Sequence, residues 1–135
     1  MGAWGADTFD NDAAGDWSYG LEGADGLTHV RTTLDAVIAV GDGYLDVDAA
    51  CEGLAACEVV ARLKGNWGAR NAYSESVDRW VEGYGAPPPA GLTEMALAVI
   101  ERVLTTPSEL LELWEEDDPT EWHSSVENLR SRVET

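Results

Sequence analysis

VDAACEGLAACEVVARLK, residues 47–64, is the stretch that decides the fold. Asp46 precedes it and Gly65 follows it, and these residue types favour the start and the end of a helix. Almost every side chain between them is apolar or small, whereas a helix at a protein surface keeps one polar face. We therefore predict a central helix over 47–64, with alanines that allow neighbouring helices to pack closely.

Apolar residues spaced three and four positions apart, as on one face of a helix, recur along the rest of the chain. This spacing predicts further helices over 12–22, 27–40, 74–84 and 92–105, then a short helix around Leu110 and a last helix around Val126. Asp10 or Asn11 can cap the first of them. The sequence thus predicts one acidic all-α domain over 1–135, a helical bundle of about six or seven helices.

Two tetrapeptides near the end of the chain, TPSE at 106–109 and DPTE at 118–121, carry the same helix-start signal. In each, the first residue is expected to cap the helix and proline suits the first helical position. The glutamate that follows can bond back to the cap N–H. We expect one helix to begin at each tetrapeptide.

Acidic residues dominate the charge: 26 Asp and Glu stand against 8 Lys and Arg, a formal net charge of −18. Binding to nucleic acid or to an anionic membrane surface depends on basic side chains, so neither is expected as a partner. A basic protein partner is expected instead. The apolar share of 44%, with six Trp, is sufficient for a folded core and argues against disorder.

Two features bear on the compartment. The most apolar run, 36–41, is far shorter than the ~20 residues that a membrane-spanning helix requires. Cys51 and Cys57 lie in one predicted helix, on different faces, so they cannot form a disulfide with each other. We expect reduced thiols and a cytoplasmic protein.

The acids are unevenly placed along the chain. No basic residue lies between Arg102 and Arg130. The carboxylates in the middle of that stretch form the candidate partner-binding surface: Glu112, Glu115, Glu116, Asp117 and Asp118.

Glu58 stands in a run of the central helix that is otherwise free of charge, and Arg62 follows one helical turn later. The interpretation we favour is a solvated helix edge that this pair closes. The alternative is a carboxylate in a pocket, with Arg62 beside it. One carboxylate is not a catalytic constellation, so the pocket reading needs further residues.

The other titratable residues form no catalytic or metal-binding pattern. The acids at 10–16 are similar to a calcium loop, but Ala14 and Leu21 stand where ligands belong. The two histidines are far apart and form no helical metal pair. Either cysteine could be a nucleophile, but an alanine-rich helix favours small buried side chains. We predict no catalytic residue, no metal and no cofactor.

Aromatic residues are expected mainly in the core. The tryptophans that fall on apolar helical stripes are Trp17, Trp80, Trp114 and Trp122. Trp4 and Phe9 flank a short glycine-containing segment ahead of the first helix. Leaving both in water would forgo a large apolar stabilisation, so we expect the first 17 residues to dock on the bundle.

The N-terminal residues MGAWG (1–5), FDND (9–12) and DW (16–17) resemble the start of an uncharacterised bacterial family, domain of unknown function 4259. The run AACEVVA (55–61) is similar to the central helix of that family. The resemblance implies a full-length bacterial cytosolic domain. It implies no catalytic residue.

Two functions follow as hypotheses. The first is a non-catalytic cytosolic interaction protein, inhibitor-like or immunity-like, that presents its acidic surface to a basic protein partner. The alternative is a small enzyme or ligand-binding domain with a pocket around Glu58.

Overall fold

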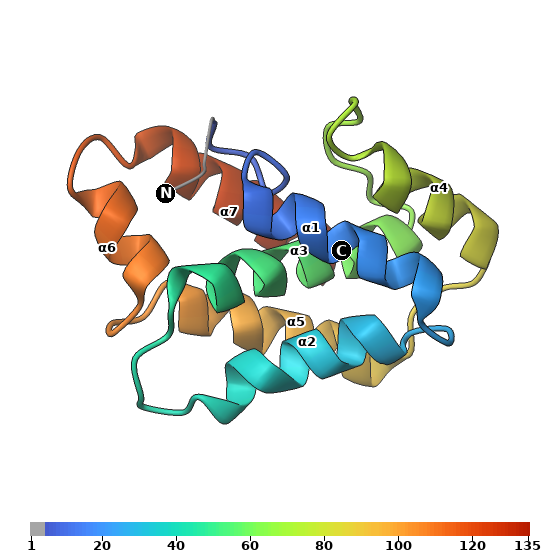
Figure 1. Cartoon of the computed structure of the whole chain (residues 1–135), viewed down its shortest axis with the longest axis horizontal. Coiled ribbons are helices and arrows are strands. Elements are labelled where there is room, and N and C mark those ends of the chain that lie inside the picture. The colour runs from blue at the N-terminus through green and yellow to red at the C-terminus, as the bar shows by residue number, and fades with distance from the viewer. Residues whose placement is uncertain (1–4) are drawn as a thin grey trace.

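The computed structural model describes residues 5–135, and these residues form seven α-helices and no strand (Figure 1). The prediction of an all-α bundle is confirmed. The helices are α1 (Asp12–Gly23), α2 (Thr28–Ala39), α3 (Val47–Leu63), α4 (Glu75–Tyr84), α5 (Ala90–Val103), α6 (Glu109–Glu115) and α7 (Thr120–Glu134). No helix in the described part of the chain is long and apolar enough to cross a membrane.

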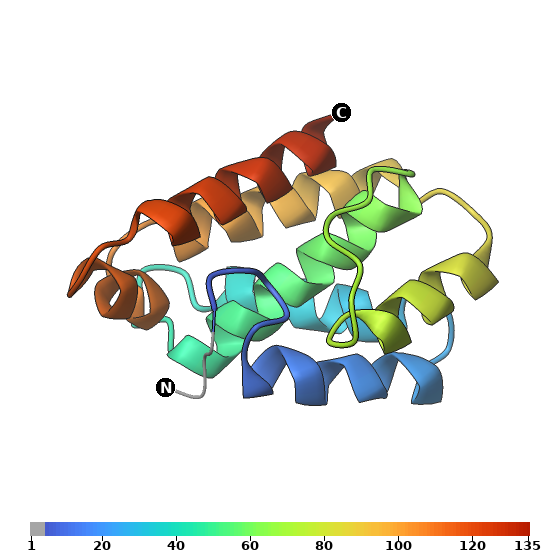
Figure 2. The same ribbon diagram turned by 90° about the horizontal axis from the view of Figure 1, so that it is seen from above.

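The predicted helix over 47–64 is α3, and it occupies the centre of the bundle. Every residue from 53 to 63 is buried, because the other six helices all pack against α3 (Figures 1 and 2). Gly53 shows how close this packing is. A Cβ atom there would lie 2.9 Å from a methyl of Val37 on α2 and 3.0 Å from one of Val99 on α5. A helix buried on all sides has no room for a polar face.

Local capping signals set two helix starts, those of α1 and α3, as the sequence predicts. Asn11 Oδ1 accepts from the Ala14 N–H at 2.8 Å and caps α1. Asp46 Oδ1 accepts from the Ala49 N–H at 2.9 Å and caps α3. At the second tetrapeptide, α7 begins at Thr120 with Pro119 in the cap position, and Asp118 Oδ1 accepts from the Thr120 N–H at 3.0 Å without capping the helix.

The first tetrapeptide behaves differently, and the prediction of Thr106 as a cap is wrong. The backbone at 107–109 pairs with Leu45, whose N–H donates to Pro107 O at 3.2 Å and whose carbonyl accepts from the Glu109 N–H at 2.9 Å. This pairing keeps the chain extended, so α6 begins only at Glu109. The Glu109 carboxylate instead accepts from the Val47 N–H at 2.8 Å, at the start of α3.

Four tryptophans lie in or against the core, as predicted, whereas Tyr19, Tyr44 and Tyr73 are exposed. Trp17 and Trp122 are buried, and Trp17 Nε1 donates to Thr33 Oγ1 at 2.7 Å. The half-buried Trp114 and Trp80 pack against the core from its edges. Phe9 is buried, which places the segment ahead of α1 on the bundle. Trp4 lies outside the described residues.

Candidate functional site

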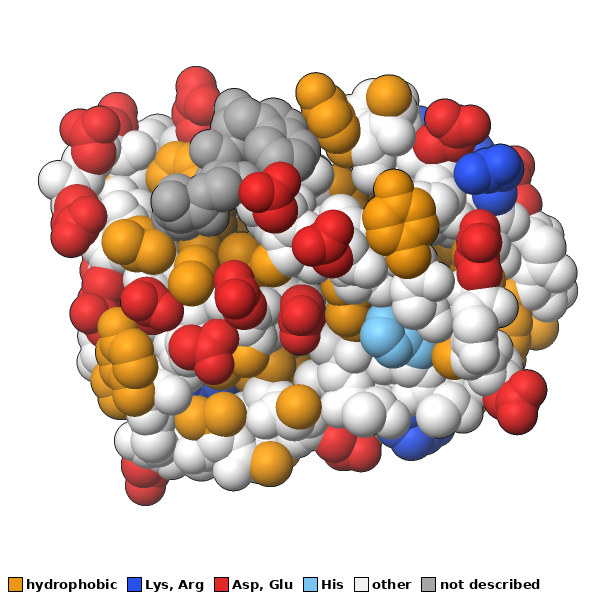
Figure 3. All heavy atoms as spheres, in the orientation of Figure 1, with side chains coloured by type: hydrophobic (Ala, Val, Ile, Leu, Met, Phe, Trp, Pro, Cys, Tyr) orange, Lys and Arg blue, Asp and Glu red, His pale blue; other side chains and the backbone are white. Residues whose placement is uncertain are grey.

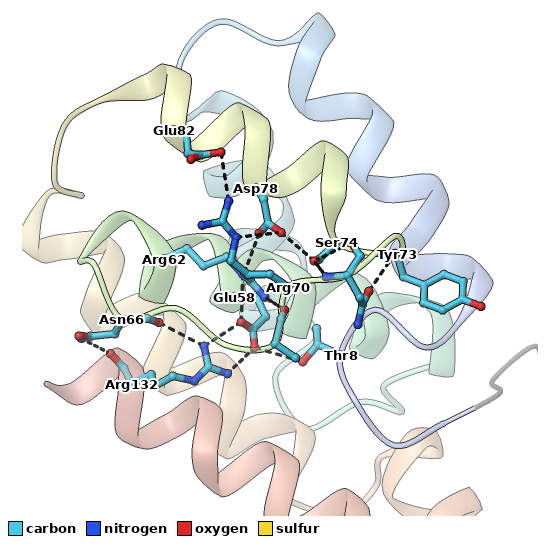
Figure 4. Close-up of polar contacts among 12 residues, drawn as sticks. Thr8, Glu58, Arg62, Asn66, Arg70, Tyr73, Ser74, Asp78, Glu82 and Arg132 are labelled. Carbon is cyan, nitrogen blue, oxygen red and sulfur yellow. Dashed lines mark hydrogen bonds and ion pairs between the residues drawn. The ribbon is translucent and has the colours of Figure 1, made fainter.

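Glu58 and Arg62 are both buried, with 4% and 3% of their surface exposed. The favoured interpretation of a solvated helix edge is therefore wrong. The pair lies where three segments cover α3: the segment 7–10, the loop 66–74 that follows α3, and the last turns of α7 (Figure 4). Helical periodicity could not show this, because the covering segments come from both ends of the chain.

Glu58 is held mainly by Arg132 of α7. The two guanidinium nitrogens Nη1 and Nη2 of Arg132 donate to the two carboxylate oxygens at 2.8 and 2.7 Å. Thr8 Oγ1 adds a longer contact of 3.5 Å. Arg132 is itself oriented by Asn128 Oδ1, which accepts from its Nε at 2.7 Å, and by the carbonyl of Asn66. Both carboxylate oxygens of Glu58 are thus occupied.

Arg62 joins α3 to α4 and to the loop between them. Its Nη1 donates to Asp78 Oδ1 at 2.6 Å and its Nη2 to the Ala69 carbonyl at 2.9 Å. Its guanidinium carbon lies between two aromatic rings, 5.7 Å from the centre of Phe9 and 5.6 Å from that of Trp67. A cation placed between rings in this way gains attraction from their π-systems.

Asp78 completes the arrangement from α4. Its second oxygen accepts from Ser74 Oγ at 2.8 Å and lies 3.6 Å from Arg70 Nε. Ser74 is the N-cap residue of α4, but its hydroxyl makes this contact instead of capping the helix. We call Glu58, Arg62, Asp78 and Arg132 the ion-pair hub. Two carboxylates face two guanidinium groups there, so each buried charge has a partner, as burial requires.

Sequence reasoning identified half of the hub. Glu58 and Arg62 stood out because they interrupt an apolar helix. Asp78 and Arg132 gave no comparable signal, because each lies on an amphipathic helix among other charged residues. Only the fold brings Arg132 to Glu58, over a separation of 74 residues.

A cleft of about 160 Å³ opens beside the hub, between the segment 7–10, the loop before α4, and α7. We call it the hub cleft. Its polar lining residues include Asp7, Thr8, Asp10, Glu58, Arg62, Asn71, Ser74, Ser125, Asn128 and Arg132. No histidine or cysteine lines it, and the oxygens of Glu58 already accept from Arg132, so Glu58 is not placed as a free general base.

The two cysteines are buried and free. Burial, with smaller contributions from Asp48, Glu52 and Asp46, raises the pKa of Cys51 to about 12. Burial also raises the pKa of Cys57 well above its ordinary value, and Glu58 adds to the effect. The thiolate is the nucleophilic form, so neither residue is placed to act as a nucleophile near neutral pH.

Both histidines take part in local contacts. His29 stacks on Trp17, with ring centres 4.6 Å apart, and its Nε2 lies 3.0 Å from the Trp17 carbonyl. His123 Nε2 lies 3.9 Å from a carboxylate oxygen of Glu115. Among residues 5–135, no group of three or more His, Cys, Asp or Glu side chains converges in a way that could hold a metal ion.

The candidate partner-binding carboxylates from 112 to 118 are all exposed, on α6 and the turn that follows it. We call them the α6 acidic surface. Tyr44 borders it, and its hydroxyl donates to Glu112 Oε1 at 3.4 Å. Loss of water contact, then the charges of Glu112 and Glu109, raise the pKa of Tyr44. Hydrogen bonds from Thr120 lower the pKa of Asp118.

Acidic side chains also spread over the wider face that Figure 3 shows, whereas few basic ones appear there.

Comparison with known proteins identifies the family of the chain. A protein-family model described as a domain of unknown function (DUF4259) matches residues 2–125. The comparison found no matching curated protein and no matching solved structure.

Proposed function

The chain belongs to the DUF4259 family, a domain of unknown function, and from this premise we propose that it is a non-catalytic protein-binding domain. In this proposal the α6 acidic surface receives a basic protein partner, in the manner of an inhibitor or an immunity protein. The observation that carries the proposal is the exposure of all its carboxylates in a stretch that contains no Lys or Arg.

The use of the basic residues elsewhere supports the same function. Arg62 and Arg132 pair with buried carboxylates in the ion-pair hub. Arg102 donates to the carbonyls of Gly41, Thr105 and Pro107. These hydrogen bonds hold two loops together. The exposed basic residues are Arg31, Arg70 and Arg79, and none of them lies in the stretch 112–118.

Charge of one sign on a surface speeds the encounter with a partner of the other sign and helps to select it. Tyr44, 54% exposed at the edge of the α6 acidic surface, adds an aromatic group of the kind that anchors protein interfaces. A partner that fits is therefore a protein with a patch of Lys or Arg and an apolar recess for one ring. A cytosolic location belongs to the proposal, and the free, buried thiols support it.

The test compares two variants that lose equal charge from exposed positions. The surface variant carries Glu112→Gln, Glu115→Gln, Glu116→Gln, Asp117→Asn and Asp118→Asn. The control variant carries Glu22→Gln, Glu75→Gln, Glu94→Gln, Asp25→Asn and Asp35→Asn. Each set replaces three Glu and two Asp that are exposed.

Immobilised wild type, surface variant and control variant are used to capture proteins from host lysate, and the bound proteins are identified by mass spectrometry. We expect a basic protein to bind wild type and control variant and to be lost from the surface variant. Its purified form should associate more slowly with wild type as salt increases, because salt screens the steering charges. Equal capture by both variants would contradict the proposal.

A further inference from the structure

The hub cleft contains hydrogen-bond donors that the ion-pair hub leaves unused. Among residues 5–135, Arg62 Nε is the one buried side-chain N or O atom without a hydrogen bond. It lies 3.3 Å from Glu58 Oε1 but out of line for a bond. Its accessible surface is below 1 Å², so neither water nor a ligand in the cleft reaches this nitrogen, and the donors that a ligand can reach lie elsewhere in the lining.

Two exposed amide groups of the lining carry donors that a ligand can reach. Asn71 Oδ1 accepts from the Tyr73 N–H at 2.9 Å, and Asn128 Oδ1 accepts from Arg132 Nε at 2.7 Å. Each side chain is therefore held in place by its oxygen, and among residues 5–135 its NH₂ group has no hydrogen-bond partner. The cleft thus offers a ligand two amide donors.

Acceptors come from the segment ahead of α1. Asp7 Oδ1 accepts from Ser125 Oγ at 3.1 Å, and Asp10 Oδ2 accepts from the Asp7 N–H at 3.2 Å. Among residues 5–135, the second oxygen of each carboxylate accepts no hydrogen bond and remains for a ligand. A molecule in the hub cleft must therefore both accept and donate hydrogen bonds, which a hydroxyl group does and a carboxylate or an ammonium group does not.

The charges of the lining also favour a neutral molecule. An anion would enter against a chain of net charge −18 and meet Asp7, Asp10 and Glu58. A cation would meet the guanidinium groups of Arg62 and Arg132 at the deep end. Glu58 could offer a cation little compensation, because Arg132 occupies both of its oxygens. A neutral ligand avoids both penalties.

The volume of the cleft sets the size of the ligand. About 160 Å³ is roughly ten times the space that a single water needs, and less than the ~300 Å³ of the smaller drug-sized pockets. Phe9, which also lines the cleft, supplies one apolar ring. We propose that the hub cleft binds a small neutral polyhydroxylated molecule of monosaccharide size, independently of the partner bound at the α6 acidic surface.

The test is a titration of the full ¹⁵N-labelled chain followed by NMR, with D-glucose, D-ribose and glycerol as neutral probes. Sodium acetate and L-lysine serve as the anionic and cationic probes. We expect saturable shifts at residues of the hub cleft for at least one neutral probe, with a dissociation constant of about 1–10 mM, and no saturable shifts there for the charged probes.

Two variants test the assigned donors. Asn71→Asp with Asn128→Asp keeps each oxygen that holds its side chain and removes each NH₂ donor, and it should weaken binding at least about tenfold. Ser131→Asp adds a charge on the exposed side of α7 outside the cleft and should leave binding unchanged.

Three results would overturn the proposal. The first is an absence of saturable shifts with every neutral probe at about 100 mM, which would mean that the cleft holds water only. The second is tighter binding of acetate or lysine than of any neutral probe. The third is equal binding by the doubly substituted variant, provided that its spectrum retains the dispersion of the folded chain.

Discussion

Arg132 and Glu58 form a two-pronged ion pair, with nitrogen–oxygen distances of 2.8 and 2.7 Å, between helices whose residues are 74 positions apart. The Glu58 side chain is only 5% exposed and that of Arg132 16% exposed. Each charge therefore depends on the other, since a lone charge in such a site would lose most of its hydration.

Removing one partner of this pair should be costly. Arg132→Met keeps much of the apolar stem but leaves Glu58 short of its main partner, and we expect a loss of about 3–5 kcal/mol in the free energy of unfolding. Arg130→Met on the same helix breaks exposed pairs with Glu101 and Glu127 and should cost less than about 1 kcal/mol. Urea denaturation of both variants measures the difference, and similar losses would show that the hub stabilises no more than a surface pair.

Gly53 should not tolerate a larger side chain. Gly53→Ala places a Cβ atom 2.9 Å from Val37 and 3.0 Å from Val99, so α2 or α5 must shift, and we expect a loss of about 1–3 kcal/mol. Gly15→Ala in α1 is the matched control, because a Cβ atom there meets nothing within 4 Å. It should stabilise the chain by about 0.5–1 kcal/mol through helix propensity. Thermal unfolding that ranks the two variants in the opposite order would contradict this packing.

The raised pKa of Cys51 predicts a loss of stability at high pH. Burial raises this pKa to about 12 in the folded chain, whereas an unfolded cysteine titrates near ~8.5. Between these values the unfolded chain releases the proton and the folded chain keeps it. The contribution of this thiol is therefore complete below the unfolded pKa and declines as the pH rises towards the folded one.

Cys51→Ala should make the stability of the chain less dependent on pH in that range. The difference between wild type and variant should change by up to about 1.4 kcal/mol per pH unit. Urea midpoints measured from pH 8 upwards provide the comparison. Parallel curves for the two proteins would mean that Cys51 ionises equally easily when folded.

Salt should stabilise the chain. Repulsion among acids at a net charge of −18 opposes the compact state, and added salt screens it. We expect the melting temperature to rise between low and physiological ionic strength, and the surface variant, with five fewer charges, to show a smaller rise. Differential scanning calorimetry measures both slopes. A melting temperature independent of salt would mean that the acids are too far apart to destabilise the fold.

The docking of the N-terminal segment can be tested at two positions. Phe9 is buried against Arg62, and Phe9→Ala should cost about 3–5 kcal/mol. For Trp4 the sequence prediction stands: Trp4→Ala should cost a similar amount if its ring is buried. Denaturant unfolding that shows a loss below about 0.5 kcal/mol for Trp4→Ala would instead indicate a surface position.

The sequence predicted those features that local chemistry controls. Asn11 and Asp46 cap their helices because a short polar side chain reaches an N–H three residues away in any context. The central position of α3 was predicted because nearly all faces of this helix carry apolar or small side chains. The start of α6 was predicted wrongly because Leu45, far away in the chain, pairs with the backbone at 107–109 and overrides the local signal.

The candidate site was only half predictable for a related reason. A charged residue in an apolar helix is visible in the sequence, so Glu58 and Arg62 were found. Their burial was the less favoured of two interpretations, because it depends on segments that periodicity does not connect to α3. The hub cleft likewise exists only where residues from both ends of the chain meet.

The separation of 74 residues between Glu58 and Arg132 also sets a time interval between their synthesis on the ribosome. A ribosome adds about 5–20 residues per second, so roughly 4–15 s pass between the synthesis of Glu58 and that of its partner. During this interval α3 can form, but Glu58 cannot be buried at an acceptable cost. The nascent bundle must therefore stay open along the side that α7 later covers, and α7 closes it.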